Sequence, residues 1–199
     1  MAIPLFIFAA TVCRFIKSRA SSPETQLTKF LQYRTTSRLD ATYRPVLGQL
    51  LVDVDPSDKE DVIKGFREVV GSIILLAAPL STRSICSLLR IQKDDIDSRL
   101  RLLHSVISVP SETDSPIRIF HLSFRNFLVD LAKSTTNEFW IDEKKCHERL
   151  TKRYLELMSS GYLKRDICKL KMLKKIRTKV AAETINACLP AHVQYACLY

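Results

Sequence analysis

The sequence predicts a mainly α protein, a helical bundle that contains a winged-helix subdomain of three helices and a β-hairpin. The 199 residues include only 4 Gly, and apolar residues recur at helical spacing over long runs. After His104 the apolar spacing changes from 3.6 residues towards 2, on both sides of a turn-rich segment. With 46% hydrophobic and 26% charged residues, the composition is that of an ordinary globular protein.

Helices are expected along the first quarter of the chain. Residues 1–17 form an apolar run with basic residues near its end, which suits the negative end of a helix dipole. Residues 25–33 predict a short amphipathic helix, and residues 39–52 a helical pattern that Pro45 partly interrupts. The segment 53–58 is the best candidate for a linker, and its last residues can cap the helix that follows.

The winged helix is expected after this linker. Pro79 is expected to stop its first helix, and Ser81 or Thr82 to cap the second. The expected elements are helices at 62–77, 82–89 and 91–103, strands at 106–109 and 117–120, and a further helix at 123–131. Phe124, Phe127 and Leu128 share one face of that last helix and are expected in the core.

Two helical segments are expected in the C-terminal third. Residues 144–159 predict a strongly amphipathic helix, and residues 163–189 a helical region with breaks. The residues expected to face inward on the first are Cys146, Leu150, Tyr154, Leu157 and Met158. Trp140, next to Phe139, is expected to anchor this helix to the rest of the fold.

Several short motifs occur in a fixed order. They are Leu-Leu-His-Ser-Val at 102–106, His-Leu-Ser-Phe-Arg-Asn-Phe-Leu at 121–128, Phe-Trp-Ile-Asp at 139–142, Asp-Ile-Cys at 166–168 and Gln-Tyr-Ala-Cys at 194–197. This set closely resembles the segment after the NACHT nucleotide-binding core in fungal STAND-class NTPases, the incompatibility-type NACHT/WD-repeat proteins. The resemblance covers nearly the whole chain.

The resemblance implies three parts and a regulatory role. Residues 1–52 would be the helical tail of the NACHT region, 57–131 the winged-helix domain, and 132–199 a helical extension before WD or other sensor repeats. The family uses this region as a lever that packs on the nucleotide-binding core and swings away on activation, allowing oligomerisation. The NACHT core, in cis or in trans, would therefore be the partner, in cytoplasmic non-self recognition or programmed cell death.

His121 has two interpretations. The residue pattern alone favours a structural role, in which the ring caps the turn or bonds a backbone carbonyl. The resemblance implies a second role, because the winged-helix His of a similar His-x-Ser-Phe-x-x-Phe motif contacts the β-phosphate of bound ADP and helps hold the closed state. His121 would then sense a nucleotide without any bond-making chemistry.

Most of the net charge of +10 comes from one segment, residues 164–179. It carries eight basic residues against Asp166 alone: Lys164, Arg165, Lys169, Lys171, Lys174, Lys175, Arg177 and Lys179. Apolar residues recur between them every three to four positions, which predicts an amphipathic basic helix. A solvated face is the simplest interpretation, and binding to nucleic acid or to an anionic surface is the alternative. Members of the resembled family usually carry a Pro-Gly turn and fewer lysines here.

The winged helix does not itself predict DNA binding. Residues 92–116, which hold its recognition helix and wing, carry five acidic residues against three basic ones, so the net charge is −2. Contacts to phosphates dominate affinity for nucleic acids, so this is the wrong sign in the position that would face DNA. The aspartates suit the first turn of a helix, or a contact to the nucleotide-binding core.

No enzyme is expected in this chain. It has no G-x-x-x-x-G-K-[ST] motif, and the nearest pattern, Gly65 to Gly71, has the wrong spacing and no following Lys. ADP or ATP is therefore implied only for a complete NACHT parent, and a partial gene product is a further possibility. The six cysteines contain no C-x-x-C pair and lie mostly among apolar residues, which favours buried thiols in a reducing compartment over a metal site. Residues 1–16 are too short to span a bilayer.

Overall fold

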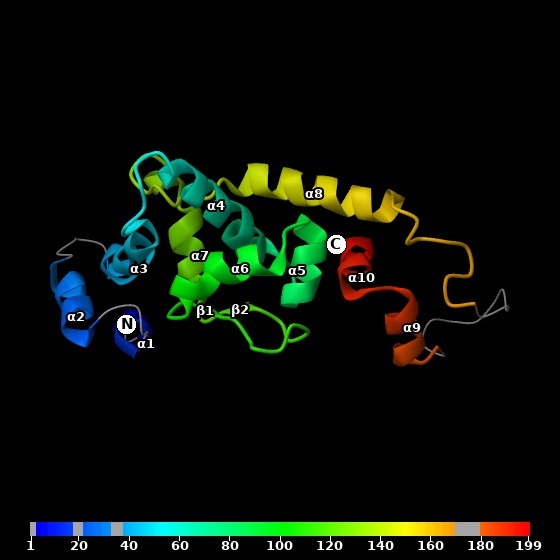
Figure 1. Ribbon diagram of the computed structural model, residues 1–199, viewed down its shortest axis with the longest axis horizontal. Coiled ribbons are helices and arrows are strands. Elements are labelled where there is room, and N and C mark those ends of the chain that lie inside the picture. The colour runs from blue at the N-terminus through cyan, green and yellow to red at the C-terminus, as the bar shows by residue number, and fades with distance from the viewer. Residues whose placement is uncertain (1–2, 18–21, 33–37, 170–179) are drawn as a thin grey trace.

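The computed structural model describes residues 3–17, 22–32, 38–169 and 180–199, and these are mainly helical (Figure 1). The described residues form ten α-helices and one two-stranded hairpin, which confirms the predicted fold class. The helices are α1 (Ile3–Lys17), α2 (Pro23–Gln32), α3 (Arg38–Gly48), α4 (Lys59–Leu75), α5 (Thr82–Leu89), α6 (Lys93–Leu100), α7 (Leu122–Val129), α8 (Glu143–Ser159), α9 (Ala182–Cys188) and α10 (Ala191–Leu198). The strands are β1 (Ile107–Ser108) and β2 (Arg118–Ile119).

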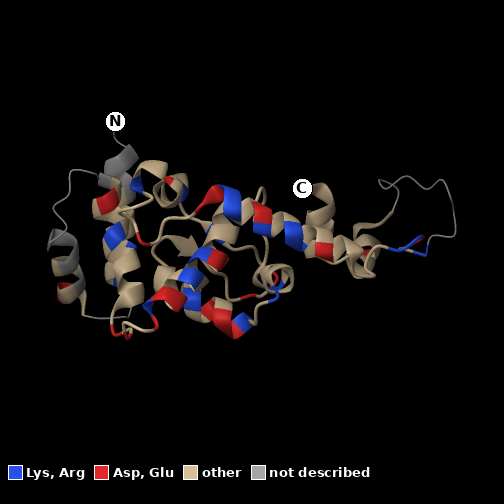
Figure 2. Cartoon of the chain, turned by 90° about the horizontal axis from the view of Figure 1, so that it is seen from above, with Lys and Arg blue, Asp and Glu red and all other residues tan. Residues whose placement is uncertain are grey.

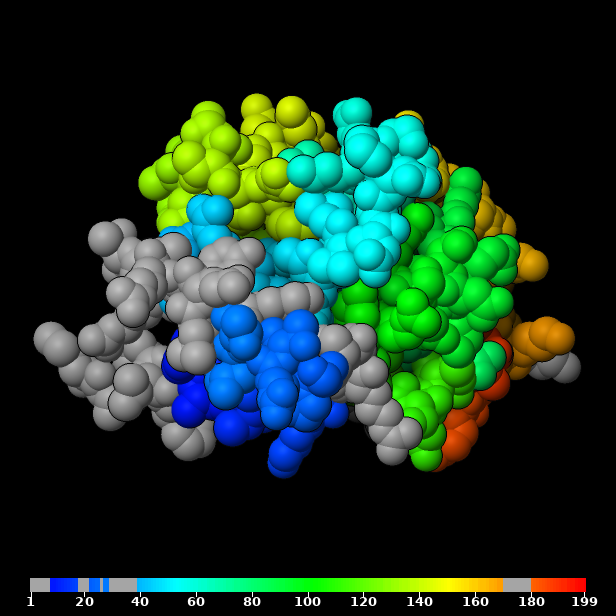
Figure 3. All heavy atoms as spheres, turned by 60° about the vertical axis from the view of Figure 1, so that its left-hand side comes forward, coloured from blue at the N-terminus to red at the C-terminus, as the bar shows by residue number. Residues whose placement is uncertain are grey.

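Helices α1, α2 and α3 lie together at one end of the molecule (Figure 1). Figure 3, in which this end comes forward, shows α1 and α2 in blue beside the cyan segment around residues 40–60. Helix α3 continues through Pro45 and into a 3-10 turn at Gln49–Leu51. The ring of Tyr43 is buried, 5.2 Å from that of Phe124 and 5.3 Å from that of Phe127, so α3 is fixed against α7.

The order of elements from α4 to β2 is the predicted one of three helices and a hairpin. The strands are shorter than predicted, because only Ile107 with Ile119 and Ser108 with Arg118 pair in the antiparallel ladder. Part of the predicted return strand joins the start of α5 instead, where the Ile117 N–H donates to the Leu80 carbonyl at 2.9 Å. The hairpin is therefore held by the loop before α5 as well as by its own ladder.

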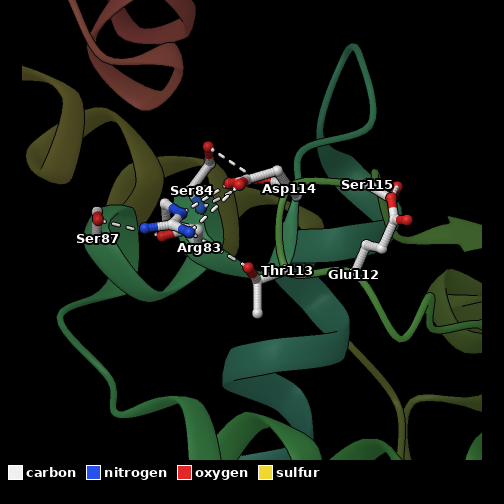
Figure 4. Close-up of polar contacts among 8 residues, drawn as sticks. Arg83, Ser84, Ser87, Glu112, Thr113, Asp114 and Ser115 are labelled. Carbon is white, nitrogen blue, oxygen red and sulfur yellow. Dashed lines mark hydrogen bonds and ion pairs between the residues drawn. The ribbon is translucent and has the colours of Figure 1, made fainter.

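The tip of the hairpin is tied to α5 by one arginine (Figure 4). Arg83 donates from Nε and Nη2 to the Asp114 carboxylate at 2.7 and 3.2 Å, and from Nη2 to Thr113 Oγ1 at 3.3 Å. Its backbone N–H donates to the Thr113 carbonyl at 3.1 Å. The ion pair is exposed to solvent and stabilises the fold little, but the set of four bonds fixes the position of the tip.

The two glycines that superficially suggested a phosphate loop lie inside α4, where they allow close helix packing. A Cβ at position 65 would lie 2.9 Å from Arg99 Nε of α6, and one at position 71 would lie 3.3 Å from Ile141 Cγ2. Helix α4 ends at Leu75 rather than next to Pro79, and Ser81 caps α5 by accepting from the Ser84 N–H at 3.3 Å. The predicted cap of α5 is thus confirmed.

Helix α8 lies along α4, and α10 packs against both α8 and α5 (Figure 1). Cys146, Leu150 and Leu157 of α8 are buried as predicted, and the Tyr195 hydroxyl of α10 accepts from the Ala77 N–H at 2.7 Å. Phe139 packs edge-on against Phe66, 4.9 Å between ring centroids, and so anchors the start of α8.

The C-terminal helix prediction was wrong in part. Residues 163–169 form turns and coil instead of helix, with Asp166 and Lys169 in the left-handed region at φ of 52° and 50°. Repeated residues in that region are incompatible with an α-helix. Among the residues described in this segment, the helical part is α9, while residues 170–179 lie outside the described residues.

One buried cluster connects α1, α3 to α8 and α10. It includes Phe15 of α1, Tyr43 of α3, Phe124 of α7 and Tyr195 of α10. The three-part division at 52, 57 and 131 stays a prediction. None of the helices described is long and apolar enough to cross a membrane.

Candidate functional site

His121 is the N-cap residue of α7. Its backbone is extended, and its Nδ1 accepts a hydrogen bond from the Ser123 backbone N–H at 3.0 Å. A cap of this kind satisfies one of the N–H groups that the first turn of a helix leaves without a partner. The structural interpretation of His121 is therefore confirmed, whether or not the residue has a second role.

A chain of hydrogen bonds links this cap to α3. Ser123 Oγ lies 2.8 Å from His121 Nδ1 and 2.6 Å from the Tyr43 hydroxyl. Because Nδ1 already accepts from a backbone N–H, it carries no proton, and Ser123 must donate to it. Tyr43 then donates to Ser123. Burial raises the pKa of Tyr43, and the bond to Ser123 lowers it by less, so the phenol remains a donor at neutral pH.

These bonds also set the tautomer of His121. With Nδ1 unprotonated, the neutral imidazole carries its proton on Nε2. The ring thus has one nitrogen engaged in the fold and one N–H donor left over. A nitrogen donor of this kind bonds readily to an anionic oxygen.

His121 lines a small pocket of about 120 Å³ between α1, α3 and the start of α7. Its other lining residues include Arg14, Tyr43, Ser105 and Phe120. Ser105 is 3% exposed, and its hydroxyl has no hydrogen-bond partner among the described residues. A buried polar group without a partner costs free energy, so a ligand oxygen could bond to this shielded hydroxyl only after a small shift of the side chains around it.

Arg14 supplies positive charge beside the pocket. Its guanidinium carbon lies 4.0 Å from the centroid of the Phe120 ring, which is an ordinary cation–π distance. Among the described residues that line the pocket, Arg14 and His121 are the only basic side chains and there is no carboxylate. The pocket therefore combines a cation, an imidazole N–H and a free hydroxyl, which is a donor set suited to a phosphate or a carboxylate.

Sequence reasoning found His121 but missed Arg14, Tyr43 and Ser105 as its neighbours. Tyr43 and Ser123 are 80 positions apart, and no local pattern reveals that they touch. Ser105 lies in the motif at 102–106, yet nothing in the sequence shows that its hydroxyl lacks a partner. These contacts depend on how α1 and α3 dock on α7.

The basic segment is only partly described. Lys164, Arg165 and Lys169 are exposed, and they lie in turns and coil rather than in the predicted amphipathic helix, at the end of the molecule opposite the N-terminal helices (Figure 2). The other five basic residues lie outside the described residues: Lys171, Lys174, Lys175, Arg177 and Lys179. The prediction of a basic helix is thus wrong for 164–169.

The acidic residues of the recognition helix are arranged as dipole matching predicts. Asp94 and Asp95 lie in the first turn of α6, and Asp97 pairs with Lys93. At the hairpin tip Asp114 is paired with Arg83.

The cysteines are less buried than predicted. Cys146 is buried, but Cys13 and Cys197 are exposed and the other three are half-buried. The exposure of a cysteine depends on which face of its helix it occupies, and residue type alone does not determine that face. Within the described part of the chain, no three His, Cys, Asp or Glu side chains gather closely enough to hold a metal ion.

Comparison with known proteins adds no family to these observations. No protein-family model, curated protein or solved structure matches the chain. The geometry of the site must carry the functional argument.

Proposed function

We propose that this chain is a non-catalytic regulatory module of a STAND-class NACHT NTPase, in which His121 senses the phosphate of a bound nucleotide. The motif order of the sequence supports this, as does the fold of three helices and a hairpin followed by α7. The single observation that carries the proposal is the donor set around His121. His121, Ser105 and Arg14 line one pocket whose described lining residues include no carboxylate, and their side chains can supply an imidazole N–H, a hydroxyl and a guanidinium.

The size of the pocket decides how the nucleotide would be held. Pockets for whole small molecules are usually about 300–1,000 Å³. The pocket at His121 is about 120 Å³, which accommodates a phosphate group but not a nucleotide. The base and sugar would therefore be bound by a separate nucleotide-binding core, in cis or in trans, and this chain would contact only the phosphate end.

Such a contact biases a conformational equilibrium. A phosphate that bonds to His121 only when the winged helix packs on the core stabilises that packing, and loss of the contact favours release. The resemblance implies that the biological setting is cytoplasmic non-self recognition or programmed cell death, with oligomerisation after release. The chain itself is expected to hydrolyse no nucleotide, and clear ATPase activity of the purified chain would contradict the proposal.

The first experiment measures the size of the native product by immunoblot, with an antibody raised against residues 139–199. A band near 22.8 kDa would indicate a stand-alone module, whose core partner would be sought by pull-down. A band several times larger would indicate a parent chain that contains its own core.

Two variants of His121 then separate sensing from capping in the native protein. Asn is a good N-cap residue without the imidazole N–H, so His121→Asn should keep the helix cap and lose the phosphate donor. ADP affinity should fall about 10- to 100-fold, since a hydrogen bond to a charged group contributes about 1.5–3 kcal/mol. His121→Ala should lose the cap as well, with about 1 kcal/mol less stability. Unchanged ADP affinity in His121→Asn would reject the sensing role.

A second candidate function is binding to nucleic acid or to an anionic surface through residues 164–179. The observation that favours it is the exposure of Lys164, Arg165 and Lys169. Affinity would then fall steeply with salt. Replacing Lys171, Lys174 and Lys175 by Glu should abolish it, and unchanged binding would reject this candidate.

A further inference from the structure

A second and larger pocket shares no lining residue with the His121 site. It is a groove of about 650 Å³ between the N-terminal halves of α4 and α8, closed at one end by residues 138–142. The segment before α4 and the segment before α8 meet here, as Figures 1 and 3 show. The groove has the volume of a site for a small organic ligand.

The lining has an apolar part at its base. Ile141 and Cys146 are 2% and 3% exposed, and the half-buried Ile63 contributes from α4. Trp140, the only tryptophan of the chain, also lines the groove and is half-buried. An indole ring beside two isoleucines offers a flat apolar surface on which a planar group can stack.

The charges of the groove leave a positive surplus. Five Lys or Arg side chains and three carboxylates line it. Two carboxylates are paired, Glu138 with Lys59 at 3.0 Å and Asp142 with Lys145 at 3.8 Å. The charged lining residues outside these two ion pairs are one carboxylate, Glu60, and three cations, Lys64, Arg67 and Arg149.

Two of those three cations are held in place without being neutralised. Arg67 donates from Nη2 to the Glu138 carbonyl at 2.6 Å, and Arg149 donates from Nη2 to the Glu68 carbonyl at 3.2 Å. A carbonyl orients a guanidinium but leaves its positive charge intact. The third cation, Lys64, is exposed and forms no ion pair with the described residues. The groove therefore presents pre-positioned positive charge above an apolar base.

Two donors at the groove have no partner in the fold. They are Trp140 Nε1 and Arg149 Nε, both shielded from solvent. Turning the indole towards a ligand would break no hydrogen bond of Trp140 Nε1 with the described residues, whereas turning the guanidinium would also move Arg149 Nη2 away from the Glu68 carbonyl.

We infer that this groove binds a planar organic anion, with its ring on Trp140 and its anionic group at Lys64, Arg67 and Arg149. An inorganic anion would leave the apolar base unused, and an uncharged ring would leave the cations unused. The inference does not depend on the role of His121, which lies in a different pocket.

The test uses 1-naphthyl phosphate as the probe, with inorganic phosphate and 1-naphthol as its two halves. Isothermal titration calorimetry gives the affinities. The single indole N–H resonance in a ¹H–¹⁵N spectrum reports on the groove, because the chain has one Trp. The probe should bind at least tenfold more tightly than either half and shift that resonance. Binding no tighter than that of 1-naphthol would overturn the inference.

A matched pair of variants locates the binding. Lys64→Glu reverses the unpaired charge of the groove and should weaken the probe at least fivefold. Lys152→Glu makes the same charge change on an exposed position of α8 outside the groove, and should leave the affinity within twofold. Equal affinity of the two variants would overturn the inference, and circular dichroism checks that both remain folded.

Discussion

Removing the Tyr43 hydroxyl tests whether the hydrogen bonds from α3 to His121 exist in solution. Tyr43→Phe keeps the ring, so its contacts with Phe124 and Phe127 at 5.2 and 5.3 Å are retained. Only the donor to Ser123 Oγ, 2.6 Å away, is lost. Ser123 Oγ then still donates to His121 Nδ1, but it no longer accepts a hydrogen bond from residue 43.

The expected loss of stability is that of one partly buried hydrogen bond. Such a bond contributes about 1 kcal/mol net, because the unfolded chain bonds to water instead. For a chain of this size that corresponds to a fall in Tm of about 2–4 °C. The urea m-value should not change, since the surface exposed on unfolding is the same.

Urea denaturation followed by circular dichroism measures the difference. Tyr162→Phe is the matched control, because Tyr162 is exposed and its hydroxyl makes no bond with the described residues; its stability should change by less than about 0.5 kcal/mol. A double-mutant cycle with Ser123→Ala should give a coupling of at least about 0.5 kcal/mol. Equal effects of the two Tyr variants, or no coupling, would refute the chain of bonds.

Two further predictions concern helices α10 and α4. Burial lowers the pKa of His192, whose Nε2 has no partner, below its usual 6.5. The unfolded state then binds the proton more tightly, so stability is complete above about pH 6.5 and falls as the pH drops below it. His192→Gln should flatten that fall between pH 7 and pH 5.5 in urea titrations; the same slope in both proteins would contradict the prediction. Gly65→Ala should be near neutral, because the helix gains about 1 kcal/mol and the Arg99 side chain can move aside. Gly71→Ala meets the packed Ile141 and Cys146 and should be at least about 1 kcal/mol less stable than Gly65→Ala, which the same titrations would show.

The fold class could be read from the sequence because its signals are local. Helical spacing located α4 and α8 to within a few residues, and Ser81 was correctly predicted as a cap. The core positions Phe124, Phe127 and Leu128 follow from spacings of three and four alone, and each is at most 1% exposed. Local signals are those that a single sequence carries best.

The predictions that failed depended on non-local contacts or on backbone conformation. The hairpin strands shrink to two residues each because the chain around Ile117 bonds to the loop before α5. Residues 163–169 have a helical apolar spacing, yet Asp166 and Lys169 adopt left-handed backbone angles that no helix allows. An apolar pattern indicates which face would be buried if a helix formed, but the pattern alone does not make the helix stable.

The site at His121 could not be predicted because its walls come from four separate segments. Arg14 belongs to α1, Tyr43 to α3, Ser105 to the segment before β1, and His121 to the start of α7. Because the cap fixes the tautomer of His121, its Nε2 carries a proton whenever His121 caps α7. The pocket around it exists only when α1 and α3 are docked on α7. An anion that bonds across the pocket would therefore stabilise the docked arrangement of α1, α3 and α7. The stabilisation equals the difference between the free energy of binding to the assembled pocket and that of binding to the undocked helices. A phosphate contact of this kind couples ligand binding to helix packing without any chemistry at the site.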